Sequence, residues 1–522
     1  MKRSFLLVFL LLAYLFSCEP DEIQEVPPNI VVFLVDDMGW QDTSVPFWTK
    51  RTAFNDRYHT PNMELLAREG MKFTQAYATP VCSPTRVSLM TGMNTARHRV
   101  TNWTLRRDSL QPMEKNHDSL IFPLWNVNGM SPVAGDSLAV YAMPLAQALS
   151  DMGYYTVHTG KAHLGAKGTV GENPFNLGFD VNIAGHAAGA PESYLGTENF
   201  GNGKPGKEVW AVPGLEKYHG EDIFLTEALT QEAINALDTV LTTKRPFFLY
   251  MAHYAVHTPI MGDERFLTKY LEKGLDSTEA KYASMVEGMD KSLGDIMDYL
   301  KKEDLTDNTV ILFMSDNGGL SAHARGGEPH THNKPLSSGK GSMREGGIRA
   351  PMLVKWPDKV EPGSVSDYQI IIEDFYPTIL EIAGMDSLNT VQKIDGKSFL
   401  SVLTGEKEYQ GVRPLFWHYP NEWGPDGPGI GAASAIRKGD WKLIYYHASR
   451  RMELFNLKDD IGETSNLFTD HLEKAKELAE DLTQHLEAVN AQMPKDKRTG
   501  EQIEYPLEVL EAKMNDEPTR PE

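Results

Sequence analysis

The sequence predicts an α/β protein: a large, mostly parallel sheet flanked by helices, followed by a smaller C-terminal α+β domain with a short antiparallel sheet and a long helix. Three observations support this prediction. Apolar runs typical of strands alternate with helical patterns from residue 29 to Gly384, and the pattern changes after that glycine. The composition, with 41% hydrophobic and 24% charged residues among 522, is that of an ordinary globular protein. It excludes a wholly disordered, collagen-like or coiled-coil chain.

Four β-branched and aromatic runs are expected to be strands buried on both faces of the parallel sheet, because such strands are continuously apolar. These runs are residues 29–35, 246–251, 309–314 and 351–354. Helices are expected between them wherever apolar residues recur at spacings of three and four. The predicted helices are residues 144–152, residues 222–242, and a helix containing Met285, Met289, Leu293, Ile296 and Leu300.

The C-terminal segment has a different pattern. Residues 414–419 and 441–446 are predicted to be short strands of a smaller sheet. Apolar residues from Leu472 to Val489 recur at helical spacing and predict one long amphipathic helix. We therefore expect a main domain over residues 29–404 and a C-terminal α+β subdomain over residues 405–522.

The N-terminus is typical of an exported protein. Lys2 and Arg3 precede an apolar run, residues 5–16, which is shorter than the roughly 20 residues needed to span a bilayer and fits a secretory signal. The run ends in Leu15-Phe16-Ser17-Cys18, which resembles the lipobox of bacterial lipoproteins.

This lipobox resemblance implies a signal peptide over residues 1–17, lipidation of Cys18, and an acidic tether over residues 18–28. The protein would then be an exported bacterial lipoprotein, in the periplasm or at the outer membrane or cell surface. It would contact membrane only through its lipid anchor. The alternative is an uncleaved N-terminal anchor with an incidental thiol.

The net charge limits the kinds of partner. Asp and Glu, at 72, outnumber Lys and Arg, at 51, which gives a formal charge of −21. This balance argues against a nucleic-acid partner, because a polyanion normally needs a basic face. Any anionic substrate would need a local cationic pocket.

Two of the predicted strands end in pairs of oxygen-bearing side chains. Asp36-Asp37 follows one strand, and Asp316-Asn317 follows another. Ligand sites of open parallel sheets lie at the carboxyl ends of the strands, so the two pairs are expected to converge. Their oxygens suit Ca²⁺ or Mg²⁺ rather than zinc. The alternative is that each pair belongs to a turn or a helix cap.

A cysteine stands at the predicted start of a helix. Pro84 is placed for the first helical turn, which would hold Cys82 at the helix N-terminus, where negative charge is favoured. Two readings stay open from the residues alone. Cys82 is a thiolate nucleophile, for which no nearby base is evident in the sequence, or it is a small buried apolar residue.

The segment Cys82-x-Pro84-x-Arg86, followed by Thr91-Gly92, resembles the first signature of the formylglycine-dependent sulfatases. These are the bacterial type I sulfatases of the alkaline-phosphatase-like superfamily. A second signature agrees at each fixed position, and single residues match elsewhere along almost the whole chain. The further matches are Gly153-Tyr154-x-Thr156-x-x-x-Gly160-Lys161-x-His163, Asp36-Asp37, Asp316-Asn317-Gly318, His253, His257 and Lys340.

Two positions depart from the family pattern. Thr85 stands where serine is commonest, and Met93 stands where the family usually has a basic residue. Neither belongs to the Cys-x-Pro-x-Arg core, although Met93 removes one expected charge near the site.

The resemblance implies a sulfuric ester hydrolase that removes sulfate from a sulfated glycan, of algal or host origin. It implies that a formylglycine-generating or anaerobic maturation enzyme converts Cys82 to formylglycine, whose hydrated aldehyde is the nucleophile. It also implies one Ca²⁺ per chain as cofactor. The implied metal ligands are Asp36, Asp37, residue 82, Asp316 and Asn317.

The resemblance also assigns roles to the other matching residues. Arg86 would hold the diol, and Lys161 and Lys340 would bind sulfate oxygens. His163 would be the base that deprotonates the diol, and His257 would contact the substrate as the acid for the leaving alcohol.

Other readings remain at this point. A phosphodiesterase or phosphonate monoester hydrolase of the same superfamily is the alternative enzyme, and a non-catalytic glycan-binding lipoprotein is the alternative outside enzymes. His253 is expected to be a packed neighbour of the site. A polar loop near Lys340 either lines a sugar subsite or is solvated; its residues are His323, His330, His332 and Asn333.

Overall fold

The computed structural model describes residues 27–115, 117–385, 387, 389–406 and 412–516. The predicted signal peptide, Cys18 and all of the tether before residue 27 lie outside these residues. Within the described part, no helix is both long enough and apolar enough to span a membrane.

The described chain forms one large sheet of nine strands. The strands are β1 (Asn29–Val35), β2 (Met71–Tyr77), β6 (Tyr155–Gly160), β7 (Val181–Ile183), β8 (Phe247–Ala252), β9 (Thr309–Ser315), β10 (Arg349–Lys355), β11 (Ser364–Ser366) and β12 (Ile370–Ile371). Their spatial order is β11-β2-β10-β9-β1-β8-β6-β7, with β12 also paired to β2. Every pairing is parallel except those of β10, which is antiparallel to both β9 and β2. The predicted mostly parallel sheet is confirmed.

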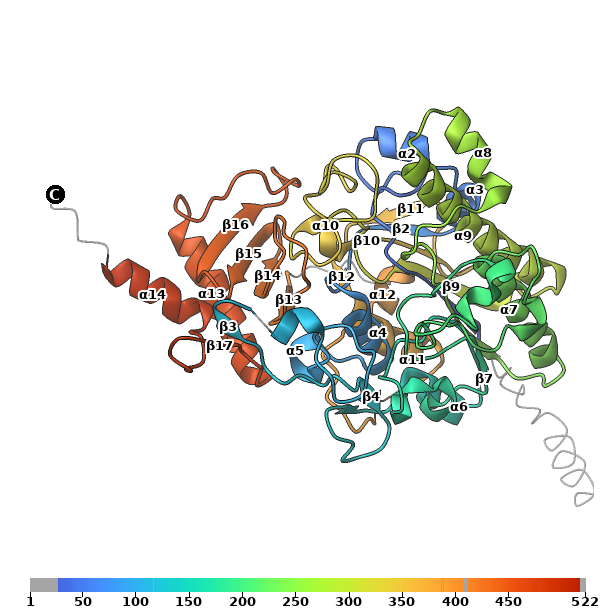
Figure 1. The fold of residues 1–522 in the computed structure, drawn as a ribbon, viewed down its shortest axis with the longest axis horizontal. Helices are drawn as coiled ribbons and strands as arrows, with labels where there is room; N and C mark the ends of the chain where they lie inside the picture. The colour runs from blue at the N-terminus through green and yellow to red at the C-terminus, as the bar shows by residue number, and fades with distance from the viewer. Residues whose placement is uncertain (1–26, 116, 386, 388, 407–411, 517–522) are drawn as a thin grey trace, which may run out of the picture.

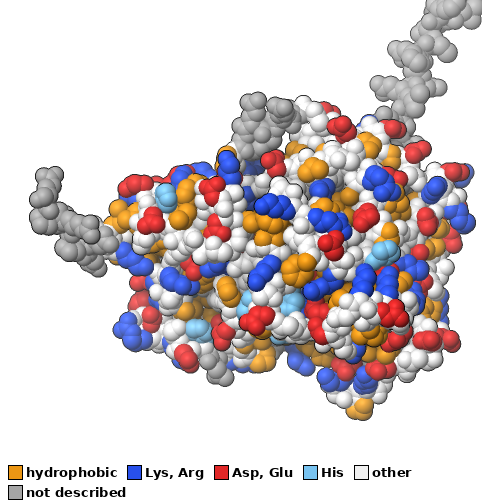
Figure 2. Space-filling view, turned by 90° about the horizontal axis from the view of Figure 1, so that it is seen from above, with side chains coloured by type: hydrophobic (Ala, Val, Ile, Leu, Met, Phe, Trp, Pro, Cys, Tyr) orange, Lys and Arg blue, Asp and Glu red, His pale blue; other side chains and the backbone are white. Residues whose placement is uncertain are grey.

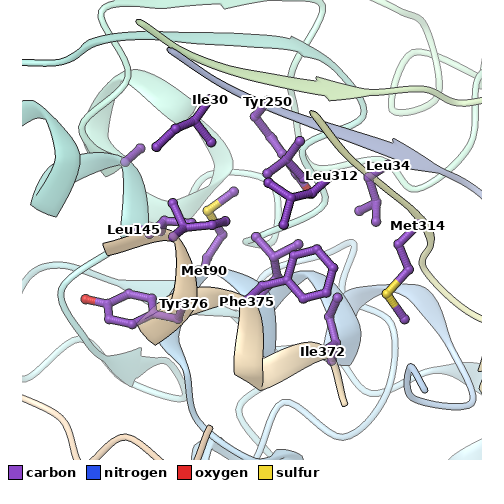
Figure 3. Packing of buried hydrophobic residues seen from close by; sticks show 14 of the residues in the cluster. Ile30, Leu34, Met90, Leu145, Tyr250, Leu312, Met314, Ile372, Phe375 and Tyr376 are labelled. Carbon is purple, nitrogen blue, oxygen red and sulfur yellow. The ribbon is translucent and has the colours of Figure 1, made fainter. Parts of the chain in front are cut away.

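Helices cover both faces of this sheet. Successive residues of a strand point to opposite faces. Ile30 and Leu34 of β1 therefore join one core with α4 (Cys82–Thr91), α6 (Leu145–Asp151) and α11 (Phe375–Ile382). Val31 and Phe33 join the other core with α3 (Pro61–Glu69), α7 (Leu225–Leu241) and α9 (Ser277–Lys302). Figure 3 shows the first core, where Leu312 and Tyr250 of the strands lie over Phe375 of α11.

The predicted helices match α6, α7 and α9 closely. Shorter elements connect the layers. They are α2 (Ala53–Arg57), α5 (Thr95–His98), α8 (Glu264–Glu272), α10 (Glu345–Ile348), α12 (Leu400–Leu403), β3 (Leu120–Ile121), β4 (Met130–Ser131), β5 (Val140–Tyr141) and β17 (Lys495–Asp496), with seven short 3-10 helices in the described residues.

The C-terminal part is a smaller α+β unit, seen on the left of Figure 1. Four antiparallel strands pair in chain order, and a long helix follows them, as predicted. The elements are β13 (Pro414–Tyr419), β14 (Ala433–Lys438), β15 (Trp441–Tyr446), β16 (Arg451–Asn456), α13 (Leu472–Ala488) and α14 (Pro506–Asp516). The boundary between residues 404 and 405 stays a prediction.

The two faces of the small sheet have different partners. Ile436 and Leu443 pack against α13, which closes a separate core. Trp417 and Ile444 face the other way and pack with residues of the main domain, including Val81. The small domain is therefore in direct contact with the start of α4. On the surface, Figure 2 shows Lys and Arg interspersed with Asp and Glu over the face in view.

Candidate active site

The carboxyl ends of four neighbouring parallel strands meet at one place. β9, β1, β8 and β6 are adjacent in that order, and Val35 of β1 lies opposite Ser315 of β9 in the register. The residue pairs that follow these two strands are therefore neighbours, as predicted. The candidate residues after the four strands are Asp316 and Asn317, Asp36 and Asp37, His257, and Lys161 with His163.

Cys82 is brought to the same place by α4. It is the first residue of this helix, after the extended N-cap residue Val81, which confirms the predicted position at a helix N-terminus. Its side chain is buried, and Sγ lies 3.4 Å from Nδ1 of His163. The fold thus brings His163, the residue that the resemblance assigns as the base, next to Cys82.

The two departures from the family pattern have local explanations. The Thr85 hydroxyl forms hydrogen bonds with the backbone N–H and the hydroxyl of Thr79, so it secures the entry to α4. Met93 is buried in the apolar core that contains Met90 and Tyr376. A basic side chain at position 93 would be costly in that environment.

Three buried cations pair with the three carboxylates at the base of the site. Arg86 donates from Nε to Asp316 at 2.9 Å, and Lys161 Nζ donates to Asp36 at 2.6 Å. Lys340 reaches Asp37 from a separate loop, with Nζ 2.7 Å from Oδ1. The side chains are almost completely excluded from solvent, so removing one partner would leave an unpaired buried charge.

The pKa values of the two adjacent aspartates are shifted in opposite directions. Burial raises the pKa of Asp36 well above its ordinary value, and nearby Asp316 adds to this effect against the attraction of Lys161. Burial acts in the same direction on Asp37, but Lys340 and His257 outweigh it and hold the pKa of that carboxyl below its usual range. Negative charge is therefore less fully compensated at Asp36.

The hydrogen bonds of His163 define which of its nitrogens is free to act. Its Nε2 lies 2.8 Å from the carbonyl oxygen of Thr104, so Nε2 carries the proton and donates it. Burial, with Lys161 adding to it, lowers the pKa of His163 well below its ordinary value. The neutral ring then presents an unprotonated Nδ1 to residue 82.

His257 has the opposite arrangement. Its Nδ1 donates to the carbonyl oxygen of Thr258 at 2.8 Å, which leaves Nε2 facing the site, 3.6 Å from Oδ2 of Asp37. Burial and Lys340 lower the pKa of His257 to about 3. His253, by contrast, is buried against Ser292 with its Nε2 2.9 Å from the hydroxyl oxygen, so it is a packed neighbour as expected.

The family model described as Sulfatase matches residues 28–385 of the chain. The chain belongs to the sulfatase family. Members of this family are part of the alkaline-phosphatase-like superfamily and generally use a formylglycine and a divalent metal. A second model, described as N-sulphoglucosamine sulphohydrolase, C-terminal, matches residues 338–492. The protein is therefore an enzyme, a sulfatase that hydrolyses sulfuric esters.

Individual relatives agree with this assignment. A sulfatase of Formosa agariphila is 30% identical over 499 residues, which covers 85% of this chain and 85% of the relative. The N-acetylgalactosamine-6-sulfatase of Mus musculus is 31% identical over 409 residues, which covers 76% of this chain and 69% of the relative. The solved structure of Ps i-CgsB in complex with k-i-k-neocarrahexaose has a TM-score of 0.69 and 25% identity, and the match covers 94% of this chain and 98% of that one.

The donor set of this sulfatase fits a hard divalent cation. Oδ1 of Asp36 and Oδ1 of Asn317 are both buried and have no hydrogen-bond partner. Possible ligand atoms of Asp36, Asp37 and His257 lie within 4.8 Å of one another. Asp316 is close by, with Oδ2 held by Arg86 and Oδ1 accepting the Asp37 backbone N–H at 3.2 Å. Oxygens of this kind favour Ca²⁺ or Mg²⁺.

The catalytic candidates form one end of a cavity of about 590 Å³, with Cys82, His163, His257 and Lys340 among its lining residues. Apart from His323, the rest of the lining was not predicted from sequence. Three tryptophans contribute to it, and no motif or periodicity in the chain marks them. They are Trp103, Trp210 and Trp423.

The four candidate residues of the polar loop before Lys340 lie in different surroundings. His323 lines the cavity, with its ring 5.4 Å from that of Trp423. His332 and Asn333 are instead buried within the loop, where they bond to Gly326 and Gly319 backbone oxygens. His330 lies beside Ser338, with Nδ1 3.4 Å from the hydroxyl oxygen. Of these four residues, only His323 is among the cavity-lining residues described.

Proposed function

We propose that this sulfatase removes sulfate from a sulfated glycan, with Cys82 matured to formylglycine and one Ca²⁺ at the site. One observation carries the mechanism: Cys82 begins α4 and lines a roomy cavity, within reach of His163 and close enough to Lys161 and Lys340 to feel their charges. Two similar proteins support a glycan substrate, because one is an N-acetylgalactosamine-6-sulfatase and another was solved in complex with k-i-k-neocarrahexaose.

The environment of residue 82 supports a modified nucleophile. Burial raises the pKa of the Cys82 thiol, so the unmodified side chain would be mostly protonated and weakly nucleophilic at neutral pH. A separate maturation enzyme would oxidise it to the aldehyde, whose hydrate supplies two hydroxyls on one carbon. Nδ1 of His163 is oriented to accept a proton from such a group.

The buried cations serve the sulfate group. Lys161 and Lys340 approach the aspartates from two different elements, so their ammonium groups can bind different oxygens of one sulfate. Arg86 is fully engaged by Asp316 and by the Lys161 carbonyl at 2.8 Å, which supports a role in positioning residue 82 and its neighbours. A Ca²⁺ held by Asp36, Asp37, Asp316, Asn317 and residue 82 would supply further positive charge for the sulfate oxygens.

His257 is the group we assign to the leaving oxygen. Its Nδ1 is already committed to Thr258, so only Nε2 is available to transfer a proton to the departing alcohol. Burial and Lys340 oppose protonation of this ring. A bound sulfate ester is an anion and offsets Lys340, so it would raise the pKa of His257 when the acid is needed.

The test of this proposal is a paired assay with mass spectrometry. Purified enzyme is given nitrophenyl sulfate, nitrophenyl phosphate and a nitrophenyl phosphonate monoester, and the peptide containing Pro84 and Arg86 is analysed. We expect the sulfate to be the preferred ester and residue 82 to have lost sulfur and gained a carbonyl. Preference for phosphate or phosphonate would support the alternative enzyme, and full activity with an intact thiol would exclude the formylglycine mechanism.

We also propose that the enzyme is exported and anchored through Cys18, on the basis of the lipobox resemblance alone. Cells expressing the full chain with a labelled fatty acid should yield labelled wild-type protein in the membrane fraction. Cys18→Ser should carry no label. Label retained by Cys18→Ser, or wild-type protein without label, would exclude this anchor.

A further inference from the structure

We call the part of the cavity at Cys82, His257 and Lys340 its sulfate-binding end. The cavity extends well beyond these residues, and the remaining lining, called the outer wall, is largely aromatic. Trp103, Trp210 and Trp423 come from three segments far apart in the chain, yet all three line the same cavity. Its volume of about 590 Å³ falls in the range of sites for small organic ligands and exceeds what a sulfate group alone would fill. The outer wall therefore contacts the part of the substrate that carries the sulfate.

Trp423 directly borders the sulfate-binding end. A Cβ atom at Gly341 would lie 2.0 Å from Cε3 of Trp423, so the indole packs closely against the backbone beside Lys340. Gly341 also has a φ of 85°, which a residue with a side chain would rarely adopt. Trp423 is 8% exposed, so most of its surface is covered by neighbouring residues and it is held in place.

Trp103 and Trp423 are tied together by one buried carboxylate. Glu114 Oε1 accepts hydrogen bonds from Nδ2 of Asn102 at 3.1 Å and from Nδ2 of Asn421 at 2.7 Å. Asn102 directly precedes Trp103, and Asn421 lies two residues before Trp423. The Trp125 indole and the Gln111 backbone N–H donate to the same carboxylate. The two tryptophan-bearing loops are thereby preorganised relative to each other.

The outer wall offers little free charge. Among the described residues that line the cavity away from the sulfate-binding end, the carboxylate is Glu192 and the ammonium is Lys207, and these two pair with each other at 3.5 Å. Glu192 also lies 3.9 Å from Lys204. A second sulfate or a uronate on the substrate would have to compete with Glu192 for these lysines. The chain's net charge of −21 opposes further anionic groups as well.

We propose, building on the assigned glycan sulfatase function, that the aromatic outer wall binds an uncharged sugar residue next to the sulfated one, with its ring stacked on Trp103. The C–H face of a pyranose is apolar and its hydrogens carry partial positive charge, so it suits the electron-rich face of an indole. The preferred substrates are then oligosaccharides in which a sulfated sugar adjoins a neutral one. Densely charged chains of uronate or multiply sulfated units fit this wall poorly.

The test uses three related substrates: a sulfated monosaccharide, the same sugar linked to a neutral sugar, and the same sugar linked to a uronate. Nitrophenyl sulfate is assayed in parallel as a measure of sulfatase chemistry. Wild-type enzyme should show the lowest KM with the neutral disaccharide. Trp103→Ala should raise that KM about ten-fold and change the KM for the monosaccharide much less. A ten-fold change is about 1.4 kcal/mol, within the range for one aromatic stacking contact.

Trp48→Ala is the matched control. Trp48 is a partly buried tryptophan that packs against the core containing α3, α7 and α9, and it is not among the cavity-lining residues. A lower KM for the uronate disaccharide than for the neutral one would overturn the inference. So would a loss in Trp103→Ala that is equal for the monosaccharide and both disaccharides. Failure of wild-type enzyme on every sulfate ester, nitrophenyl sulfate included, would instead refute the proposed function.

Discussion

The two ends of the cavity are built in different ways. At the sulfate-binding end, Asp36, Asp37, Lys161 and Asp316 directly follow strands of the parallel sheet, Arg86 lies on α4 and Lys340 on a separate loop. Each buried cation there has a carboxylate partner. At the outer end, the tryptophans lie on loops and on the small domain, in a nearly neutral environment. With the roles proposed above, the difference teaches that rigid strand ends hold the reacting groups, while loops and the small domain contact the rest of the substrate.

The small domain contributes to both ends of the cavity. It supplies Trp423 to the outer wall, and it also secures the loop that carries Lys340. Lys442 pairs with Glu345 at 2.9 Å and with Glu463 at 2.9 Å, and all three side chains are fully buried. Arg344, four residues after Lys340, pairs with Glu453 at 2.9 Å. The loop that carries Lys340 is therefore held by ion pairs with the C-terminal domain.

The largest effect is expected at residue 82. Cys82→Ala removes the proposed nucleophile, so turnover of aryl and sugar sulfates alike should fall to background. Cys82→Ser is expected to retain one hydroxyl but no second one, so it should react once and stop. Intact mass measured after incubation with substrate should show a stable added sulfate on Cys82→Ser and none on Cys82→Ala. Multiple turnovers by either variant would contradict the mechanism.

The next effect is expected at the charge pairs. Asp316→Ala leaves Arg86 buried without its counter-charge, so activity should collapse and unfolding free energy should fall by about 3–5 kcal/mol. Asp56→Ala is the control, because its pair with Arg51 lies on the surface and is worth about 0–1 kcal/mol. Denaturant unfolding of both variants measures the difference, and equal losses would show that burial of the Asp316 pair is unimportant.

Chelation tests the same end of the cavity without a substitution. If Asp36, Asp37, Asp316 and Asn317 hold Ca²⁺, a chelator should lower both the melting temperature and the activity, and added Ca²⁺ should restore them. Retention of both properties after thorough chelation would exclude the metal assignment.

The losses of activity in the His257 and His163 variants should depend differently on the leaving group of the substrate. An aryl oxide departs with little need of a proton, so His257→Ala should slow sugar sulfates by about 10²–10⁴-fold and nitrophenyl sulfate much less. His163→Ala removes the base for residue 82 and should slow both esters to a similar extent. Variants are compared by kcat after residue 82 is verified by mass spectrometry. Equal losses on the two esters in His257→Ala would mean that His257 positions the sulfate instead.

The smallest effect is expected at the support of the outer wall. Glu114→Gln replaces two acceptor oxygens by one, so the four donors from Asn102, Gln111, Trp125 and Asn421 cannot all be satisfied. The KM for the neutral disaccharide should rise several-fold. Expressed as a free energy, this rise is about half of a ten-fold change. The KM for the monosaccharide should stay nearly constant. Glu64→Gln on α3 is the exposed control. A parallel rise in KM for both substrates would indicate a general structural role for Glu114.

Much of the site could be predicted from local sequence. The runs that became β1 and β9 are so uniformly apolar that they had to be central strands, and this placed Asp36-Asp37 and Asp316-Asn317 at one edge. Pro84 identified the start of α4 and hence the position of Cys82. β6 was missed as a strand, because its Thr and His residues interrupt the apolar run, although Lys161 was found through its signature.

What the sequence determined by itself is therefore where the two acidic pairs and Cys82 lie, because strand ends and helix starts depend on neighbours in the chain. Only the tertiary structure decided which cation pairs with which carboxylate, that Thr104 orients His163, and that three distant tryptophans share one wall. These relations join segments as far apart as Trp103 and Trp423. No local pattern encodes them, because each joins residues of separate elements that meet only in the folded main domain or, for Trp423, where the small domain packs against it.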